Sequence, residues 1–214
     1  GNTVVSAVTS ATGTYSLQWV STYTGPVILQ VVGGTYTNEA DGTVEAGPGA
    51  TTPMRAILPT APLSGATSNT AVTPFTTMAA SRAFTQSGAA AVTALVATQA
   101  NTTIEPMYGI SDIVGTAPVD PTQAVPVGAT ANAQQYGLMT AAFAQQATLL
   151  AIPDPLNFVN ALATDFGSDG SLDGLSGTNL GDQTGGVAIV PVGGTVPLTN
   201  LVGASGLVTA AGVF

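Results

Sequence analysis

The chain has 214 residues, and its only basic side chains are Arg55 and Arg82, set against 11 acidic residues, which gives a formal net charge of -9. It has no histidine, cysteine or lysine. These gaps remove most of the side chains used in general-base, Schiff-base, thiolate and imidazole–metal chemistry, so we do not expect an enzyme. Two arginines cannot neutralise a phosphate track, which excludes nucleic acid as a partner and argues against binding to anionic membranes.

Charged residues make up 6% of the chain, where an ordinary soluble domain has roughly a quarter. A neutral polar surface opposes contact between copies only weakly, so it is either a plain surface or one that packs against copies of itself. No apolar run approaches the ~20 residues of a membrane-spanning helix, so we expect no membrane insertion. The lack of lysine suits a secreted protein exposed to proteases, and we expect an extracellular or cell-surface location.

The first zone, residues 1–72, has the patterns of β-strands. Tyr15, Leu17 and Trp19 alternate with polar residues and fall on one face of an extended segment. Asp41-Gly42 is a hairpin-turn signal. The predicted strands are 3–8, 15–20, 27–32 and 54–58.

The second zone, residues 73–166, has helical patterns. Thr73 followed by Pro74 predicts an N-cap with proline at the first helical position, and Gly88 interrupts that helix. Further helices are predicted at 89–103, 131–151 and 155–166. The third zone, residues 167–214, returns to strand patterns, at 187–192, 195–198 and 207–214. Helices between two strand regions indicate an α+β protein.

Two segments, Gly13–Leu17 and Gly25–Ala40, resemble the last strands of a carboxypeptidase-regulatory-like (transthyretin-like) β-sandwich, a module of bacterial surface proteins and lipoproteins. Val72–Ala79 resembles the Thr-Pro-x-Thr-Thr segment that opens the helical region of such proteins, and the Asp-Gly pairs at 169–170 and 173–174 recur there. The resemblance covers roughly residues 10–175. It implies an Ig/transthyretin-like β-sandwich that lacks N-terminal strand(s), with an inserted small helical bundle and C-terminal strands that complete a sheet.

A sandwich that lacks a strand leaves an open edge, which the chain's own C-terminal strands or a strand from another copy could fill. Strand donation between copies predicts a structural subunit of an extracellular filament or surface fibre, with Asn2–Val8 or Leu207–Phe214 as the donor. Internal completion predicts instead a monomeric surface adhesion or ligand-binding module. Such a module would present an aromatic patch, for which Trp19, Tyr23 and Tyr36 are the candidates.

A candidate calcium loop begins at Asp165. It has acids at the first, fifth and ninth positions (Asp165, Asp169 and Asp173) and glycine at the sixth, as an EF-hand has. Gly167 and Ser176 depart from that pattern at the third and twelfth positions, and Asn179 and Asp182 could supply further oxygens. The alternative is a cluster of Asp-Gly turns without a metal. No cofactor is required in either case.

The other acidic residues give weaker signals. Glu39 with Asp41, or Asp112 with Asp120, could form a glycosidase carboxylate pair, but carboxylates in loops are more often solvated surface groups. Arg55 and Arg82 are expected to pair with nearby acids in structural roles. Asn101-Thr102-Thr103 is a formal N-glycosylation sequon.

Overall fold

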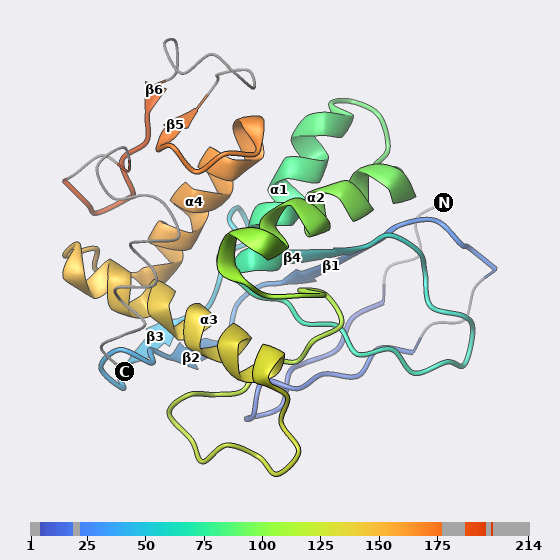
Figure 1. Cartoon of the computed structure of the whole chain (residues 1–214), viewed down its shortest axis with the longest axis horizontal. Coiled ribbons are helices and arrows are strands. Elements are labelled where there is room, and N and C mark those ends of the chain that lie inside the picture. The colour runs from blue at the N-terminus through green and yellow to red at the C-terminus, as the bar shows by residue number, and fades with distance from the viewer. Residues whose placement is uncertain (1–4, 19–21, 177–186, 196–197, 199–214) are drawn as a thin grey trace.

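The computed structural model describes residues 5–18, 22–176, 187–195 and 198. Four helices and three two-stranded antiparallel sheets make up its regular structure (Figure 1). The strands are β1 (Val27–Val31), β2 (Thr35–Thr37), β3 (Val44–Ala46), β4 (Met54–Leu58), β5 (Leu175–Ser176) and β6 (Val187–Ala188). The helices are α1 (Pro74–Ser87), α2 (Ala94–Tyr108), α3 (Ala131–Leu149) and α4 (Pro155–Asp169). No helix within these ranges is both long enough and apolar enough to cross a bilayer.

Local sequence signals located most of these elements. The strands predicted at 27–32 and 54–58 are β1 and β4, and the Asp41-Gly42 turn joins β2 to β3. All four helices are confirmed, although α2 begins at Ala94 rather than residue 89. Residues 5–8 and 15–18, the described parts of the first two predicted strands, form no strand. The segment 207–214 lies outside the described residues.

The predicted β-sandwich is wrong, although the mixed α+β class holds. Within the described ranges, the sheets pair β1 with β4, β2 with β3, and β5 with β6, and each stops at two strands. Two-stranded sheets of this length do not supply the two broad, facing layers of a sandwich. The structure therefore offers no sandwich that waits for a missing strand.

Helix side chains take the place of a third strand beside β4. The Arg55 N–H donates to Thr77 Oγ1 on α1 at 3.0 Å, and Asn101 Nδ2 on α2 donates to the Ile57 carbonyl at 3.0 Å. These bonds satisfy backbone groups that another strand would otherwise pair. Ile57, 1% exposed, then packs into the helical core. The sheet is thus closed on this side by α1 and α2.

Two glycines separate β1 from the β2–β3 hairpin. Gly33 and Gly34 both have positive φ, at 71° and 73°, a conformation that other residues adopt at a cost. They turn the chain out of β1, so that β2 pairs with β3 and not with the β1–β4 sheet. Gly47 closes the hairpin against this turn, because its N–H donates to the Gly34 carbonyl at 2.9 Å.

The core is centred on Phe75, which is fully buried in the first turn of α1. Three rings lie edge-on to it, those of Tyr108 on α2 and of Tyr136 and Phe143 on α3, with centroids 4.8, 5.6 and 5.0 Å away. Phe143 in turn lies 6.2 Å from Phe158 on α4. Aromatic pairs in this geometry add to the stabilisation from burial, so Phe75 links α1 to α2 and α3, and Phe143 extends the contact to α4.

Tyr136 also holds the N-terminus of α1 in place. Its hydroxyl donates to the Ile113 carbonyl at 2.7 Å, so it accepts from Thr73 Oγ1, also at 2.7 Å. Thr73 is the N-cap of α1 and forms a capping box with Thr76. A buried hydroxyl therefore ties this cap to the loop after α2.

We predict that Tyr136→Phe destabilises the protein by about 1–3 kcal/mol, because the Ile113 carbonyl would remain buried without its donor. Urea unfolding followed by circular dichroism measures the change. Tyr23→Phe is the control, because Tyr23 is 51% exposed and its loss should cost less than about 0.5 kcal/mol. Equal stability of the two variants would show that the Tyr136 hydroxyl does not contribute to holding α1.

Candidate functional site

The outer edge of β1 has no strand partner among the described residues. Successive residues of a strand direct their N–H and C=O groups to opposite sides. On β4, Arg55 and Ile57 direct these groups toward the helices. The alternate residues of β4 therefore bond to β1, and they are Met54, Ala56 and Leu58. In the antiparallel register, Ile28 and Gln30 lie opposite Ile57 and Arg55, so their N–H and C=O groups point away from β4. An outward row of this kind is a template for a further strand.

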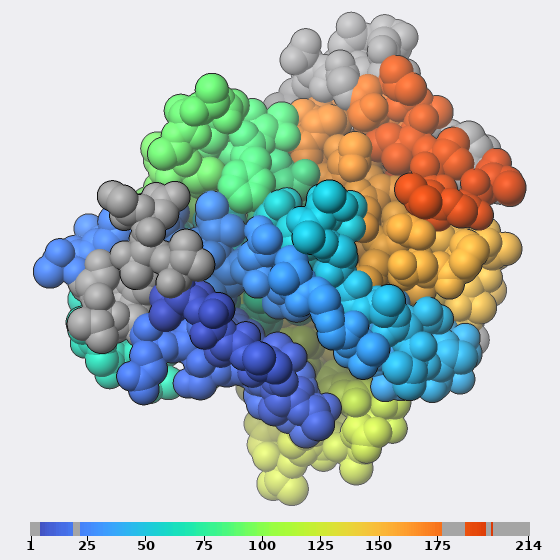
Figure 2. Space-filling model, turned by 180° about the vertical axis from the view of Figure 1, so that it is seen from behind, coloured from blue at the N-terminus to red at the C-terminus, as the bar shows by residue number. Residues whose placement is uncertain are grey.

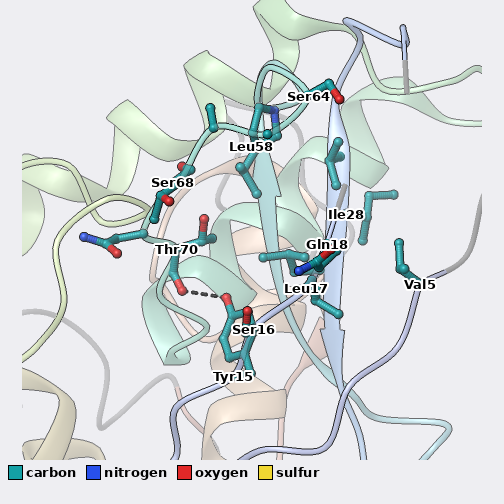
Figure 3. Close-up of a pocket in the computed structure, with 17 residues that line it drawn as sticks. Val5, Tyr15, Ser16, Leu17, Gln18, Ile28, Leu58, Ser64, Ser68 and Thr70 are labelled. Atoms are coloured by element: carbon teal, nitrogen blue, oxygen red, sulfur yellow. Dashed lines mark hydrogen bonds between the residues drawn. The ribbon is translucent and has the colours of Figure 1, made fainter. Parts of the chain in front are cut away.

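A hollow of about 600 Å³ lies beside this strand, and we call it the β1 hollow (Figure 3). Its floor includes Val27, Leu29 and Leu58, which come from β1 and β4. Residues 15–18 and 64–70 form its walls, mostly with hydroxyl and amide side chains. None of the described residues that line it is charged. The hollow therefore suits an uncharged occupant with both apolar and hydrogen-bonding groups.

The N-terminal segment lies on the surface over this region. Residues 5–14 are exposed throughout, and Figure 2 shows them as a dark blue ridge on the outside of the molecule. Tyr15 anchors the segment, because its hydroxyl donates to the Thr70 carbonyl at 2.6 Å, the bond dashed in Figure 3. Burial of Tyr15 raises the pKa of that hydroxyl, which therefore stays protonated as a donor.

The charges of the chain lie away from these segments in sequence. Residues 1–38 contain no acidic or basic side chain, and neither do residues 56–81. Both walls of the β1 hollow, β1 itself and Leu58 fall within these two stretches. Two copies that meet along these stretches would bring together no acidic side chain, although Arg55 lies against β1, where its Nε donates to Gln30 Oε1. Most other approaches would oppose two molecules of net charge -9.

The three aspartates of the candidate calcium loop have separate partners. Asp165 is fully buried, and both its oxygens accept the Gly174 N–H, at 3.1 and 3.0 Å. Asp169 accepts the Ser171 N–H at 2.7 Å, and Asp173 accepts the Leu175 N–H at 2.9 Å. These bonds fold the turn that leads from α4 into β5.

Burial raises the pKa of Asp165 to about 7, although the Gly174 N–H acts in the opposite direction. The charges of Asp173 and Asp169, and a hydrogen bond with Asp173, raise it further. Asp165 therefore holds its proton more readily than an exposed aspartate does.

An EF-hand loop is not formed at this position, because α4 continues to Asp169 and the first five positions of the proposed loop are helical. Gly167 is required for packing, since a Cβ there would overlap Ser81 Oγ on α1. The described part of the chain holds no group of three or more acidic side chains placed to share a metal ion. Asn179 and Asp182 lie outside it, so the calcium site stays a prediction.

The acids considered as carboxylate pairs close turns. Asp41 accepts the Thr43 N–H and hydroxyl at 2.9 and 2.6 Å, and these bonds lower its pKa. Asp112 accepts the Gly115 N–H at 2.8 Å, and Asp120 accepts the Thr122 N–H at 2.8 Å. Glu39 is different, because burial raises its pKa, to which the charge of Asp120 also contributes. Turn closure is the ordinary use of aspartate in such loops.

The two arginines contact mainly neutral groups. Arg55 lies 5.5 Å from the centroid of the Phe84 ring, and its Nε donates to Gln30 Oε1 at 3.4 Å. Arg82 donates to the Ser168 carbonyl at 3.0 Å, near the C-terminus of α4, where a cation is favourable. Burial lowers the pKa of Arg82, and the nearby charge of Asp169 offsets part of that effect.

The sequon and the proposed aromatic patch are placed differently from what the sequence indicated. Asn101 is 6% exposed within α2, so its amide cannot accept a glycan in the folded chain. Tyr36 donates to Asp154 at the start of α4 at 3.4 Å, whereas Tyr23 donates to the nearby Pro26 carbonyl at 3.2 Å. Trp19 lies outside the described residues.

Comparison with protein-family models, with curated proteins and with solved structures found no match to this chain. The functional inference therefore rests on the geometry of the β1 edge and its hollow.

We predict that Asp165→Asn changes how stability depends on pH. The folded state retains a proton on Asp165 up to about pH 7, whereas an unfolded aspartate loses it near its ordinary value of 3.8. The wild type therefore loses stability from this group as the pH rises between those values, and the neutral variant does not. The melting temperature of the variant should rise relative to the wild type between pH 4.5 and pH 7.5. Thr164→Ala, an exposed neighbour, should follow the wild-type curve, and a constant offset for Asp165→Asn would contradict the prediction.

Calcium binding by the 165–173 turn can be tested through its effect on thermal stability. If the 165–173 turn binds Ca²⁺ with the millimolar affinity of extracellular modules, a tenfold excess over Kd should stabilise the protein by about 1.4 kcal/mol. Thermal unfolding with CaCl₂, with MgCl₂ and with chelator tests this. Asp173→Asn should abolish the increase. Identical melting curves in all three conditions would leave the segment as a set of turns.

Proposed function

We propose that this protein is a structural subunit of an extracellular filament or surface fibre, and that its copies join by strand addition at the outer edge of β1. The observation that carries this proposal is the outward row of backbone groups at Ile28 and Gln30, which no described strand covers. The proposal does not require an incomplete sandwich, because an open edge of a two-stranded sheet can itself receive a strand.

An added strand would gain two kinds of interaction. Its backbone would pair with Ile28 and Gln30, and alternate side chains would enter the β1 hollow. Ile28 is 48% exposed and Val32 is 50% exposed, so a partner would also bury apolar surface. β1 has none of the lysines or prolines that usually prevent such pairing.

The extracellular location is supported by the placement of the two arginines. Trypsin-like proteases cut after lysine or arginine, and here both arginines lie half-buried within β4 and α1. Regular, packed backbone is a poor substrate for a protease. Trypsin-like proteases would therefore cleave the folded chain poorly after either arginine.

A second candidate function is a monomeric surface module that binds an uncharged ligand in the β1 hollow. The volume of about 600 Å³ favours it, because small-molecule sites commonly fall between about 300 and 1,000 Å³. The two functions compete for one surface, so a single experiment separates them.

We predict that the purified chain forms fibres visible by negative-stain electron microscopy and that Ile28→Lys abolishes them. The lysine would place a further positive charge on the strand edge, in addition to that of Arg55 beside Gln30, and such charges oppose strand addition. Val44→Lys is the matched control, because Val44 is 71% exposed on the separate β2–β3 hairpin and its substitution should leave fibres intact. Circular dichroism would establish that both variants fold.

Gln30→Pro provides a second variant for the same test. Proline removes the outward N–H while leaving the β1–β4 ladder bonds in place, and edge strands tolerate it. Loss of fibres in both edge variants supports strand addition. Discrete particles of the 21.0 kDa wild-type chain would overturn the filament proposal and favour the ligand-binding module.

A further inference from the structure

We propose that residues 15–18 of one copy are the segment that adds to β1 of the next copy. This inference rests on the proposed function and deepens it by identifying the donor. The segment is Tyr15-Ser16-Leu17-Gln18, and it already lines the β1 hollow of its own chain. The same surface can receive the same segment from another molecule, as in domain swapping.

The burial of this segment follows the alternation of a strand. Tyr15 and Leu17 are half-buried, whereas Ser16 and Gln18 are exposed. A period of two is what a strand requires to present one face to a partner. Even so, residues 15–18 form no strand in this structure. A strand-patterned segment without a ladder therefore lies beside a strand edge that no described strand covers.

The contacts of the segment with its own chain are weak. Within the described part of the chain, the bond from Tyr15 to the Thr70 carbonyl is the single hydrogen bond between residues 5–18 and the rest of the molecule. Residues 5–14 are exposed, and Val8 is 94% exposed. Leaving this position would cost one hydrogen bond and the partial burial of Tyr15 and Leu17, and the same contacts in a second copy would restore both.

The described residues also leave the β1 hollow unfilled. The hollow is open to solvent, and its volume of about 600 Å³, lined in part by Leu17, Leu29 and Leu58, leaves room for further side chains. A segment that pairs along β1 would bring Tyr15 and Leu17 onto that floor. The exchange would thus gain a ladder and fill space at once.

The exchange defines a polymer. Each copy would have one donor, residues 15–18, and one acceptor, β1 with its hollow. A contact between two different patches is heterologous, and it continues as a chain of molecules unless the rotation closes a ring. Residues 5–8, the described part of the predicted donor Asn2–Val8, are all exposed and show no alternation. The other predicted donor, Leu207–Phe214, lies outside the described residues and is tested by the cross-linking experiment below.

Cysteine cross-linking tests the assignment directly, because the chain has no cysteine of its own. Gln18→Cys and Ile28→Cys are prepared as two separate variants with different affinity tags, unfolded together, refolded and oxidised. A disulfide between them can form only between molecules. We expect a species carrying both tags, at about twice the mass of the chain, and fibres in the same sample.

Two further pairs serve as comparisons. Gln18→Cys mixed with Val44→Cys should give no such species, and Thr209→Cys mixed with Ile28→Cys tests the C-terminal donor. Fibres in which the 209–28 pair cross-links and the 18–28 pair does not would overturn the donor assignment while leaving strand addition intact. Single-chain particles without intermolecular disulfides would overturn both proposals. A double variant, Gln18→Cys with Ile28→Cys, that cross-links only within one chain would show that the segment stays with its own β1.

Discussion

The buried hydroxyl of Tyr136 and the capped turn that it holds are the interaction on which most of the described structure depends. Thr73–Thr77 enters the core at the start of α1, where backbone N–H groups have no helical partner. Thr73 and Thr76 satisfy two of these groups by reciprocal capping, and Tyr136 fixes the cap. Phe75 can then meet rings from α2 and α3, and Thr77 can bond to β4. Each residue of this turn except the proline makes a separate long-range or capping contact.

The same turn determines where the sheet can grow. Because α1 and α2 occupy the inner edge of β4, an added strand has access only to β1. The outward backbone groups of β1 and the adjacent hollow lie on one side of the molecule. The sequence of β1 itself carries no charge. A property that concerns assembly thus follows from how one helix is capped.

Local signals in the sequence were sufficient for the helices. The Thr73-Pro74 start, the stop at Gly88 and the Asp41-Gly42 turn act within a few residues, and all three are confirmed. The sandwich was inferred from a resemblance between short segments, and it failed because sheet pairing depends on distant partners. Nothing near β4 in sequence indicates that Thr77 and Asn101 will occupy its inner edge.

The candidate site was only partly predictable for the same reason. Alternation placed Tyr15 and Leu17 on one face, and the structure shows them lining a common hollow. The sequence of β1 could not predict its open edge, because an edge stays open only when no other segment pairs with it. Asp165 was noticed for its spacing, yet its burial and its bond to Gly174 depend on how α4 packs against α1.

The Gly33-Gly34 turn has a consequence for the colloidal behaviour of any fibre. By turning the chain out of β1, it places Glu39, Asp41 and Glu45 on or beside a hairpin that takes no part in the proposed strand addition. Growth along β1 would therefore involve none of these acids, and the exposed Asp41 would remain at the surface of every repeat. Neighbouring fibres would repel one another through them, and the repulsion would weaken as salt shortens its range. The two glycines thereby place the surface through which a fibre would lengthen apart from the acids through which fibres would repel one another.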